Sequence, residues 1–162
     1  MTSDSIPTQN TDFELFFKML EGHTGIAMGN EKEYLLAPRL SSIAQKNGFT
    51  DHVSLIKELV SKPICPLHWV TFEAMATHET MFFRDTHPFQ AIKDVLLPQL
   101  IHAKRDSNKL SIWCAAASTG QEPYSMAMLL RESFPNLSDW DVKIHATDLS
   151  ERALSQARSG IY

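Results

Sequence analysis

Hydrophobic residues recur with helical spacing through the first half of the chain. Apolar side chains at positions i, i+3, i+4 and i+7 share one face of a helix. The first such group follows Asp12, a residue suited to cap a helix, and consists of Phe13, Phe16, Phe17 and Leu20. The same spacing predicts three more helices, over residues 31–47, 51–60 and 67–77. Residues 1–11 are polar and aperiodic, so we expect a disordered lead-in before an all-helical domain over residues 12–80.

The pattern changes beyond about residue 86, where helical and strand-like segments alternate. A helix bent at Pro98 is followed by a short apolar run at residues 110–115, which is bounded by turn residues and typical of a strand. Next come a helix, a second strand and a last helix, over residues 122–133, 141–147 and 150–159. This order is typical of a parallel sheet. The predicted fold class is α/β, with a small all-α domain followed by an α/β domain over residues 81–162.

Composition narrows the classes of function. The 162 residues carry a formal net charge of −4 without clustered lysine and arginine, so binding of nucleic acid through bulk charge is not expected. No apolar run approaches the roughly 18 residues of a membrane span, so no membrane insertion is expected, and the polar N-terminus lacks the features of a secretory signal. Cys65 and Cys114 stand alone, which predicts neither a disulfide nor a metal site and favours a cytoplasmic location.

Small residues fill the predicted loop between the first strand and its helix, residues 115–122 (AAASTGQE). Small side chains allow a backbone to approach a ligand closely, and a helix N-terminus offers free N–H groups. Asp148 ends the second strand, where nucleoside-binding α/β folds place an acid against ribose hydroxyls. The loop lacks both the three glycines of the dinucleotide fingerprint and the Lys-Ser/Thr pair of a P-loop. The pattern favours a nucleoside ligand without a pyrophosphate, such as S-adenosylmethionine.

Three ordered segments carry a family resemblance: residues 75–85 (MATHETMFFRD), 112–130 (IWCAAASTGQEPYSMAMLL) and 145–162 (HATDLSERALSQARSGIY). With the helical domain in front, they resemble the chemotaxis receptor methyltransferases, the CheR family, over residues 12–162. The resemblance implies a Rossmann-like protein-glutamate O-methyltransferase. Such an enzyme transfers a methyl group from S-adenosylmethionine to glutamate side chains on the cytoplasmic helices of chemoreceptors, and S-adenosylhomocysteine is the product.

The resemblance also implies which residues bind the cofactor. Arg84 is expected to pair with the methionine carboxylate, which a planar guanidinium can bind through two hydrogen bonds. Thr80 is expected to offer its hydroxyl to the same end, and His78 stands where the family usually has asparagine and can still donate a hydrogen bond. Glu122 is expected to meet the positive amino-sulfonium side, and Asp148 the ribose diol. No catalytic base is expected, because a glutamate substrate with a pKa of about 4.3 is ionised at neutral pH.

Several of these side chains also have a structural alternative. Arg84 could lie near a helix C-terminus and stabilise its dipole, and Glu122 could be a first-turn acid. Asp148 could cap the last helix, a task for which Ser150 competes. Trp113, in the first strand, is expected to lie in the core.

The helix predicted over residues 31–47 matches the basic helix with which the family grips its acidic receptor. Arg39 and Lys46 keep a positive charge here, while the residues between them include Ser41, Ser42 and Gln45. A packed helix with a solvated polar face is therefore an alternative to a receptor-binding surface.

The resemblance implies an incomplete catalytic domain. The family's sheet has more strands than the two predicted here, so we expect a fragment that holds the first half of the catalytic domain and is inactive alone. Open strand edges and uncovered helix faces then predict self-association of the chain. Two further alternatives are a non-catalytic interaction or signalling module with a vestigial nucleoside pocket, and a nicotinamide-binding oxidoreductase, against which the missing glycines count.

Overall fold

The computed structural model describes residues 8–162, the side chains of residues 8–10 excepted. The chain packs as two units, and the boundary between them falls between Thr77 and His78. The sequence placed a domain boundary between residues 80 and 81. Residues 1–7 of the expected disordered lead-in lie outside the described residues, whereas the rest of that segment belongs to the first helix.

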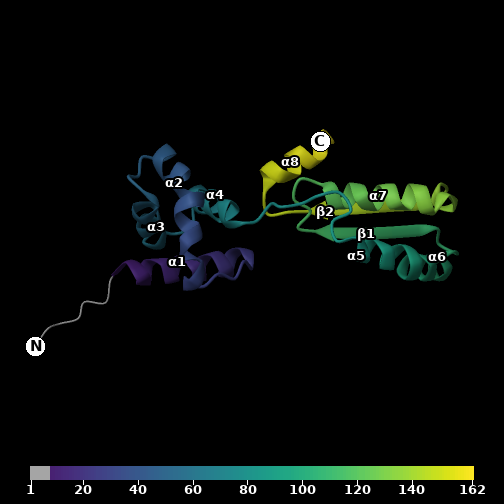
Figure 1. Ribbon diagram of the computed structural model, residues 1–162, viewed down its shortest axis with the longest axis horizontal. Coiled ribbons are helices and arrows are strands. Elements are labelled where there is room, and N and C mark those ends of the chain that lie inside the picture. The colour runs from purple at the N-terminus through teal and green to yellow at the C-terminus, as the bar shows by residue number, and fades with distance from the viewer. Residues whose placement is uncertain (1–7) are drawn as a thin grey trace, which may run out of the picture. The chain divides into compact units, whose positions relative to one another are not determined.

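The described residues of the first unit form helices and no strand (Figure 1), as the spacing of the apolar residues predicts. Its helices are α1 (Thr8–Thr24), the 3-10 helix η1 (Asn30–Leu35), α2 (Leu36–Lys46), α3 (His52–Val60) and α4 (Pro66–Met75). The prediction that Asp12 caps the first helix is wrong, because the polar residues ahead of it add another helical turn. The helix predicted over residues 31–47 begins as a 3-10 turn and becomes α-helical at Leu36.

Local chemistry explains where α3 and α4 begin. The Asp51 side chain accepts a hydrogen bond from the Ser54 N–H at 2.8 Å, and the Ser54 hydroxyl accepts one from the Asp51 N–H at 3.2 Å. This reciprocal cap starts α3, and the hydrogen bonds from Ser54 lower the pKa of Asp51. Pro66 opens α4 in the first helical turn, where the missing N–H would have no intrahelical partner.

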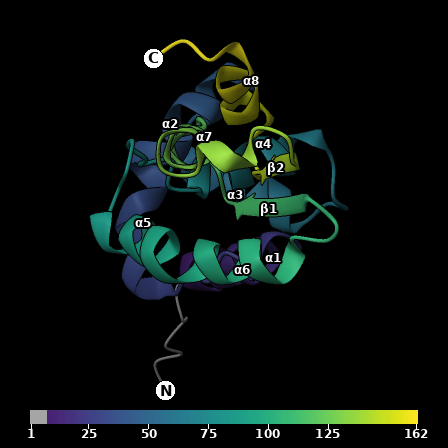
Figure 2. The same ribbon diagram turned by 90° about the vertical axis from the view of Figure 1, so that its right-hand side faces the viewer.

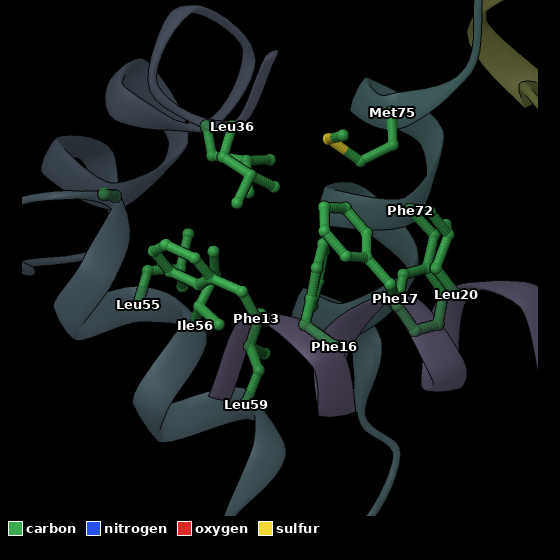
Figure 3. Packing of buried hydrophobic residues seen from close by; sticks show 12 residues of the cluster. Phe13, Phe16, Phe17, Leu20, Leu36, Leu55, Ile56, Leu59, Phe72 and Met75 are labelled. Carbon is green, nitrogen blue, oxygen red and sulfur yellow. The ribbon is translucent and has the colours of Figure 1, made fainter. Parts of the chain in front are cut away.

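Apolar side chains from all four α-helices form a closed core in the first unit. Figure 3 shows Phe16, Leu36, Phe72 and Met75 pointing into this shared interior; all four are completely buried. The cluster consists of Phe13, Phe16, Phe17, Leu20, Leu36, Leu40, Ala44, Leu55, Ile56, Leu59, Phe72 and Met75. Full burial of one large apolar side chain contributes about 1.5–3 kcal/mol, so this core stabilises the unit without any strand.

The second unit alternates helices and strands. Its elements are α5 (Thr86–Ala91), the π-helical segment η2 (Ile92–Leu96), α6 (Leu97–Lys104), β1 (Lys109–Ala115), α7 (Gln121–Ser133), the 3-10 helix η3 (Pro135–Leu137), β2 (Asp141–Thr147) and α8 (Glu151–Ser159). Just before Pro98, where the sequence predicts a bend, the helix is π-helical, and the Leu97 N–H donates to the Ile92 carbonyl. Proline lacks an N–H for the helical ladder, and such irregularities are common beside it.

The two strands pair in parallel, as their order along the chain predicts. Lys109 lies opposite Asp141 at one end of the ladder, and Ala115 lies opposite Thr147 at the other. Figures 1 and 2 show β1 and β2 side by side with α7 running beside them. The helices and one face of the sheet share a second apolar cluster, with Phe89, Leu97, Leu110, Met126, Leu129, Leu130 and Leu137 at its centre.

The other face of the sheet is exposed. Side chains alternate between faces along a strand, and the exposed set comprises Lys109, Ser111, Trp113, Ala115, Asp141, Lys143, His145 and Thr147. Trp113 is 70% exposed and donates its indole N–H to the Thr147 hydroxyl at 3.0 Å. The prediction that Trp113 lies in the core is therefore wrong, because it points to the face that no helix of this unit covers. The predicted fold class itself is confirmed: a helical unit precedes a parallel α/β unit.

Candidate functional site

The loop between β1 and α7 has a constrained backbone. Ala116 and Ser118 both adopt left-handed conformations, with φ of 55° and 50°. Residues other than glycine rarely adopt this conformation. The Ala117 N–H donates to the Thr147 carbonyl at 2.9 Å, so the loop is fastened to the end of β2. The loop therefore has a fixed shape at the carboxyl ends of both strands, where ligands bind in open α/β sheets.

The sequence predicts that small residues such as Gly120 let the backbone approach a ligand, whereas in the structure Gly120 lets other parts of the chain pack against the loop. Its φ of 101° lies in the left-handed region. A Cβ atom at this position would lie 2.6 Å from the Tyr162 hydroxyl oxygen and 2.8 Å from Ala157 Cβ. Glycine here allows α8 and the residues after it to pack closely against the loop.

Asp148 lies beside this loop. One carboxylate oxygen accepts from the Ser118 N–H at 2.7 Å, and the other accepts from the Ser150 N–H at 2.9 Å. Ser150 itself caps α8, since its hydroxyl accepts from the Ala153 N–H at 3.0 Å. The alternative in which Asp148 caps the last helix is therefore wrong, because Ser150 is the N-cap of α8 and Asp148 binds the N–H of that residue, which precedes the helix. Asp148 is half-buried, and each carboxylate oxygen can accept a further hydrogen bond.

Glu122 is exposed in the first turn of α7 and lies close to the end of β1. The link is Cys114, a buried residue near the end of that strand. Burial raises the pKa of the Cys114 thiol to about 11, and the nearby charge of Glu122 and a hydrogen bond to its carboxylate add to the effect. The Glu122 carboxylate therefore stands at the same edge of the sheet as the β1–α7 loop.

The segment of residues 78–85 is fastened to the loop and to α7. The Ser118 hydroxyl donates to the His78 carbonyl at 3.1 Å. Further along, the Phe83 N–H donates to the Ser125 hydroxyl at 2.9 Å, and that hydroxyl donates to the Gln121 carbonyl at 2.7 Å. These bonds hold the segment against the start of α7 and keep it next to the β1–α7 loop.

His78 and Thr80 are both half-buried in this segment. The Nε2 atom of His78 is buried and has no hydrogen-bond partner among the described residues. A buried polar atom without a partner is costly, and a ligand group at this position would satisfy it.

Arg84 lies in the connection before α5, more than one helical turn beyond the end of α4 at Met75. The alternative in which it stabilises a helix C-terminus is therefore wrong. Its guanidinium Nη1 donates to the Glu79 carbonyl at 2.7 Å, and its Nε lies 3.9 Å from an Asp85 carboxylate oxygen. The side chain is 48% exposed, and the guanidinium has further N–H groups for a ligand.

The structure brings some of the predicted residues together and leaves others apart. Asp148 and His78 both bind Ser118, through its N–H and its hydroxyl respectively. Glu122 stands at the same end of the sheet, whereas the hydrogen bond and ion pair of Arg84 stay within its own segment. The sequence does not predict Ser118 as a site residue, because it indicates only a small side chain at this position. A serine flanked by alanine and threonine in a strand-to-helix loop was the available signal.

The described residues contain neither a candidate metal site nor a membrane-spanning helix. Residues 8–162 bring together no three His, Cys, Asp or Glu side chains that could hold a metal ion. No helix in the same range has the length and apolar character required to cross a bilayer.

A parallel strand–helix–strand unit with an acid at the end of its second strand is typical of nucleoside-binding α/β proteins. Comparison with known families identifies which one. Residues 11–72 match the CheR methyltransferase all-alpha domain, and residues 78–162 match the CheR methyltransferase SAM binding domain. The chain belongs to the CheR methyltransferase family, which confirms the resemblance and rules out the nicotinamide-binding alternative.

Characterised relatives agree with this assignment. The chain is 40% identical over 156 residues to chemotaxis protein methyltransferase 1 of Pseudomonas aeruginosa, covering 94% of this chain and 56% of the relative. It is 39% identical over 165 residues to chemotaxis protein methyltransferase 1 of Vibrio cholerae, covering 100% and 58%. With the Escherichia coli chemotaxis protein methyltransferase the identity is 31% over 162 residues, covering 99% and 53%. The chain spans a little over half the length of these relatives.

The cofactor of this domain is S-adenosylmethionine, as predicted, and the residues present fit it. Asp148 offers carboxylate oxygens, the acceptors that ribose hydroxyls require. Glu122 offers negative charge toward a cation, and the exposed guanidinium of Arg84 can bind a carboxylate. The unpartnered His78 Nε2 is consistent with a ligand that supplies the missing hydrogen-bonding group.

Proposed function

We propose that the protein carrying this chain transfers a methyl group from S-adenosylmethionine to glutamate side chains of chemoreceptors, as a protein-glutamate O-methyltransferase. One observation carries the proposal: Asp148 is held by the Ser118 N–H at the carboxyl edge of a sheet that belongs to a CheR SAM binding domain. Relatives named chemotaxis protein methyltransferase support it.

The roles of the site residues follow from their chemistry. Arg84 binds the methionine carboxylate of the cofactor, and Thr80 donates to the same end. Glu122 attracts the positively charged amino group, Asp148 accepts from the ribose hydroxyls, and His78 meets the ligand through its unpartnered Nε2. These residues bind and orient the cofactor, and none of them is assigned as a catalytic base.

The acceptor chemistry explains why no base is required. When bound, S-adenosylmethionine supplies an activated methyl group and leaves as S-adenosylhomocysteine. A glutamate side chain has a pKa of about 4.3, so it is already a carboxylate at neutral pH. The task of the protein is then to align this carboxylate with the methyl group and to exclude water. The acceptor glutamates lie on cytoplasmic helices of the receptor, which places the reaction in the cytoplasm.

Calorimetry with S-adenosylhomocysteine on the full-length protein that carries this sequence tests the binding step. A methyl-transfer assay with radiolabelled S-adenosylmethionine and chemoreceptor-containing membranes tests the reaction. We expect saturable binding and a label that alkali releases, as it does from a methyl ester. A protein that binds receptors but neither ligand would instead support the non-catalytic interaction module.

We also propose that the 162-residue chain by itself self-associates through the uncovered face and edges of its sheet. The support is the exposed face that carries Trp113, together with strand edges that no other strand covers in the described residues. Light scattering at increasing concentration should show a rising mass. Trp113→Lys should reduce this rise, whereas Trp69→Lys, at a 44% exposed tryptophan of the first unit, should not. A wild-type chain that stays monomeric at high concentration contradicts the proposal.

A further inference from the structure

Tyr162 touches two of the segments that form the site. Its hydroxyl donates to the Thr119 carbonyl at 2.7 Å, inside the β1–α7 loop. Its ring packs edge-on against Phe82 with centroids 5.0 Å apart, and Phe82 lies two residues before Arg84. On its other side the ring packs against Tyr124, with centroids 5.7 Å apart. One side chain beyond the end of α8 thus contacts both the loop and the segment of residues 78–85.

The surroundings of Tyr162 are adapted to this contact. A Cβ atom on residue 120 would lie 2.6 Å from the Tyr162 hydroxyl oxygen, so glycine is the residue that leaves it room. Although 51% of Tyr162 is exposed, the pKa of its hydroxyl is raised, first by burial and then by the neighbouring Tyr124. The hydroxyl therefore stays protonated and remains a donor at neutral pH.

We propose that Tyr162 is a positioning residue for the cofactor site, which fixes the β1–α7 loop through the Thr119 carbonyl and the Arg84 segment through Phe82. The inference rests on the proposed function, because it concerns binding of the same cofactor. Neither Tyr162 nor Phe82 needs to touch the ligand.

The loop requires such support because its conformation is costly. Ser118 has a φ of 50° and must keep its N–H aimed at Asp148. A left-handed conformation is unfavourable for a residue other than glycine, and it persists only where the surrounding structure holds it. The hydrogen bond from Tyr162 holds the next residue, Thr119. Without it, the loop has one fastening fewer, and the Ser118 N–H that binds one Asp148 oxygen is held less firmly.

The chain offers a matched pair of variants. Tyr162→Phe removes only the hydroxyl that donates to Thr119. Tyr124→Phe removes a hydroxyl of the same kind, which donates to the Ala157 carbonyl in α8 at 3.1 Å. Both variants keep their rings, and each loses one hydrogen bond to a backbone carbonyl, so we expect similar small decreases in thermal stability.

The measurements are calorimetric affinity for S-adenosylhomocysteine and amide hydrogen exchange in residues 116–122, on the full-length protein. We expect Tyr162→Phe to weaken binding about fivefold, the equivalent of one hydrogen bond, and to speed exchange in the loop. Tyr124→Phe should change neither. Equal affinities and equal loop exchange in the two variants would overturn the positioning role while leaving the proposed function intact. A wild-type protein that does not bind the ligand would overturn both.

The contact with Phe82 is tested separately by a double-mutant cycle. Phe82→Leu and Tyr162→Leu should each weaken binding, and the double variant should lose less than the sum of the two, because both act through the same ring contact. Additive losses would remove Phe82 from the proposal.

Discussion

The two units of this chain bury their apolar side chains to different extents. In the helical first unit, none of the twelve core side chains is more than 6% exposed, and nine are completely buried. In the second unit, the central cluster ranges from 1% to 8% exposed, and one whole face of the sheet is open to solvent. A helix satisfies its own backbone and needs cover on one side, whereas a parallel sheet needs cover on both faces.

Backbone strain follows the same division. Five non-glycine residues among those described have positive φ, and all five lie in the second unit. Four of them belong to the two segments that form the site: Phe83, Asp85, Ala116 and Ser118. Strained residues gather where the surrounding structure holds them for function. The described part of the well-packed unit thus has no backbone strain of this kind, and the more open unit has both the strain and the candidate ligand-binding groups.

The largest expected effect tests the contrast between the two cores. Leu40 in the first unit is completely buried, and Leu130 in the second is 6% exposed. We expect Leu40→Ala to lower the free energy of unfolding of its unit by about 4 kcal/mol, and Leu130→Ala to lower that of its unit by about 2.5 kcal/mol, because the looser site can relax into the cavity. Denaturant titration followed by circular dichroism measures both. Equal losses, or a larger one at Leu130, would show that the second core is as tightly packed as the first.

The reactivity of the Cys114 thiol measures how readily the second unit opens. With a thiol pKa of about 11 instead of the usual 9.0, it holds about a hundredfold less thiolate near pH 8 than an ordinary thiol, and the thiolate is the reactive form. In a Cys65→Ser variant, we expect alkylation at pH 8 to be at least about a hundredfold slower in the folded chain than in denaturant. Fast labelling of the folded chain would mean that the second unit opens readily.

The same thiol sets a pH dependence of stability. The pKa of the Cys114 thiol is higher in the folded state than in the unfolded state. The contribution of this thiol to the free energy of unfolding is therefore present in full below about pH 9 and is lost as the pH rises through about 11. Cys114→Ala should remove this part of the loss of stability at alkaline pH.

Glu122→Gln should lower the pKa of the Cys114 thiol toward its usual value, because the neighbouring negative charge is gone. An unchanged pKa would place Glu122 farther from β1 than the structure does.

Arg84 tests whether the open unit binds the cofactor as proposed. Arg84→Ala should weaken calorimetric binding of S-adenosylhomocysteine by about 1.5–3 kcal/mol, the range of a charge-assisted hydrogen bond. Arg105→Ala is a matched control, because each arginine Nε lies close to the acid that follows it, at 3.9 Å from Asp85 and 3.8 Å from Asp106. Unchanged affinity in Arg84→Ala would remove this residue from the site.

The sequence predicts the architecture well because both units follow simple periodicities. The bounds predicted for the second strand coincide with β2 (Asp141–Thr147), where apolar and polar residues alternate. The exposure of Trp113 could not be predicted, because an apolar run does not say which face of a sheet is covered. The helical start ahead of Asp12 was missed for a related reason, since polar residues that extend a helix leave no apolar pattern.

For the site, the sequence supplied residue types but not their partners. Asp148 was expected at the end of the second strand, yet its bond to the Ser118 N–H depends on a left-handed residue that is not glycine. Such a conformation has no sequence signature. Tyr162 lies far from Thr119 and Phe82 along the chain, so only tertiary packing brings these residues together.

The smallest expected effect returns to the first unit and to Arg39, one of the two cations of α2, in the segment that the family resemblance links to the receptor. The Arg39 guanidinium donates to the carbonyls of Met75 and Ala76, the latter at 3.2 Å, and lies 3.5 Å from the Thr77 hydroxyl. It therefore satisfies carbonyls at the end of α4. We expect Arg39→Ala to lower the free energy of unfolding of this unit by about 1.5 kcal/mol.

Lys46 is the natural counterpart, because it is exposed in the last turn of the same helix. Lys46→Ala should change stability by less than about 0.5 kcal/mol, as surface substitutions usually do. If α2 also faces an acidic receptor, Lys46→Ala should lower receptor methylation although it leaves stability unchanged. Arg39→Ala should then lower methylation only to the extent that it unfolds the unit. The reverse outcome, in which Arg39→Ala leaves stability intact and lowers methylation, would make Arg39 a receptor contact. Lower methylation without a loss of stability, in either variant, would give the helical unit a functional surface of its own, and the division between a structural unit and a functional unit would then no longer hold.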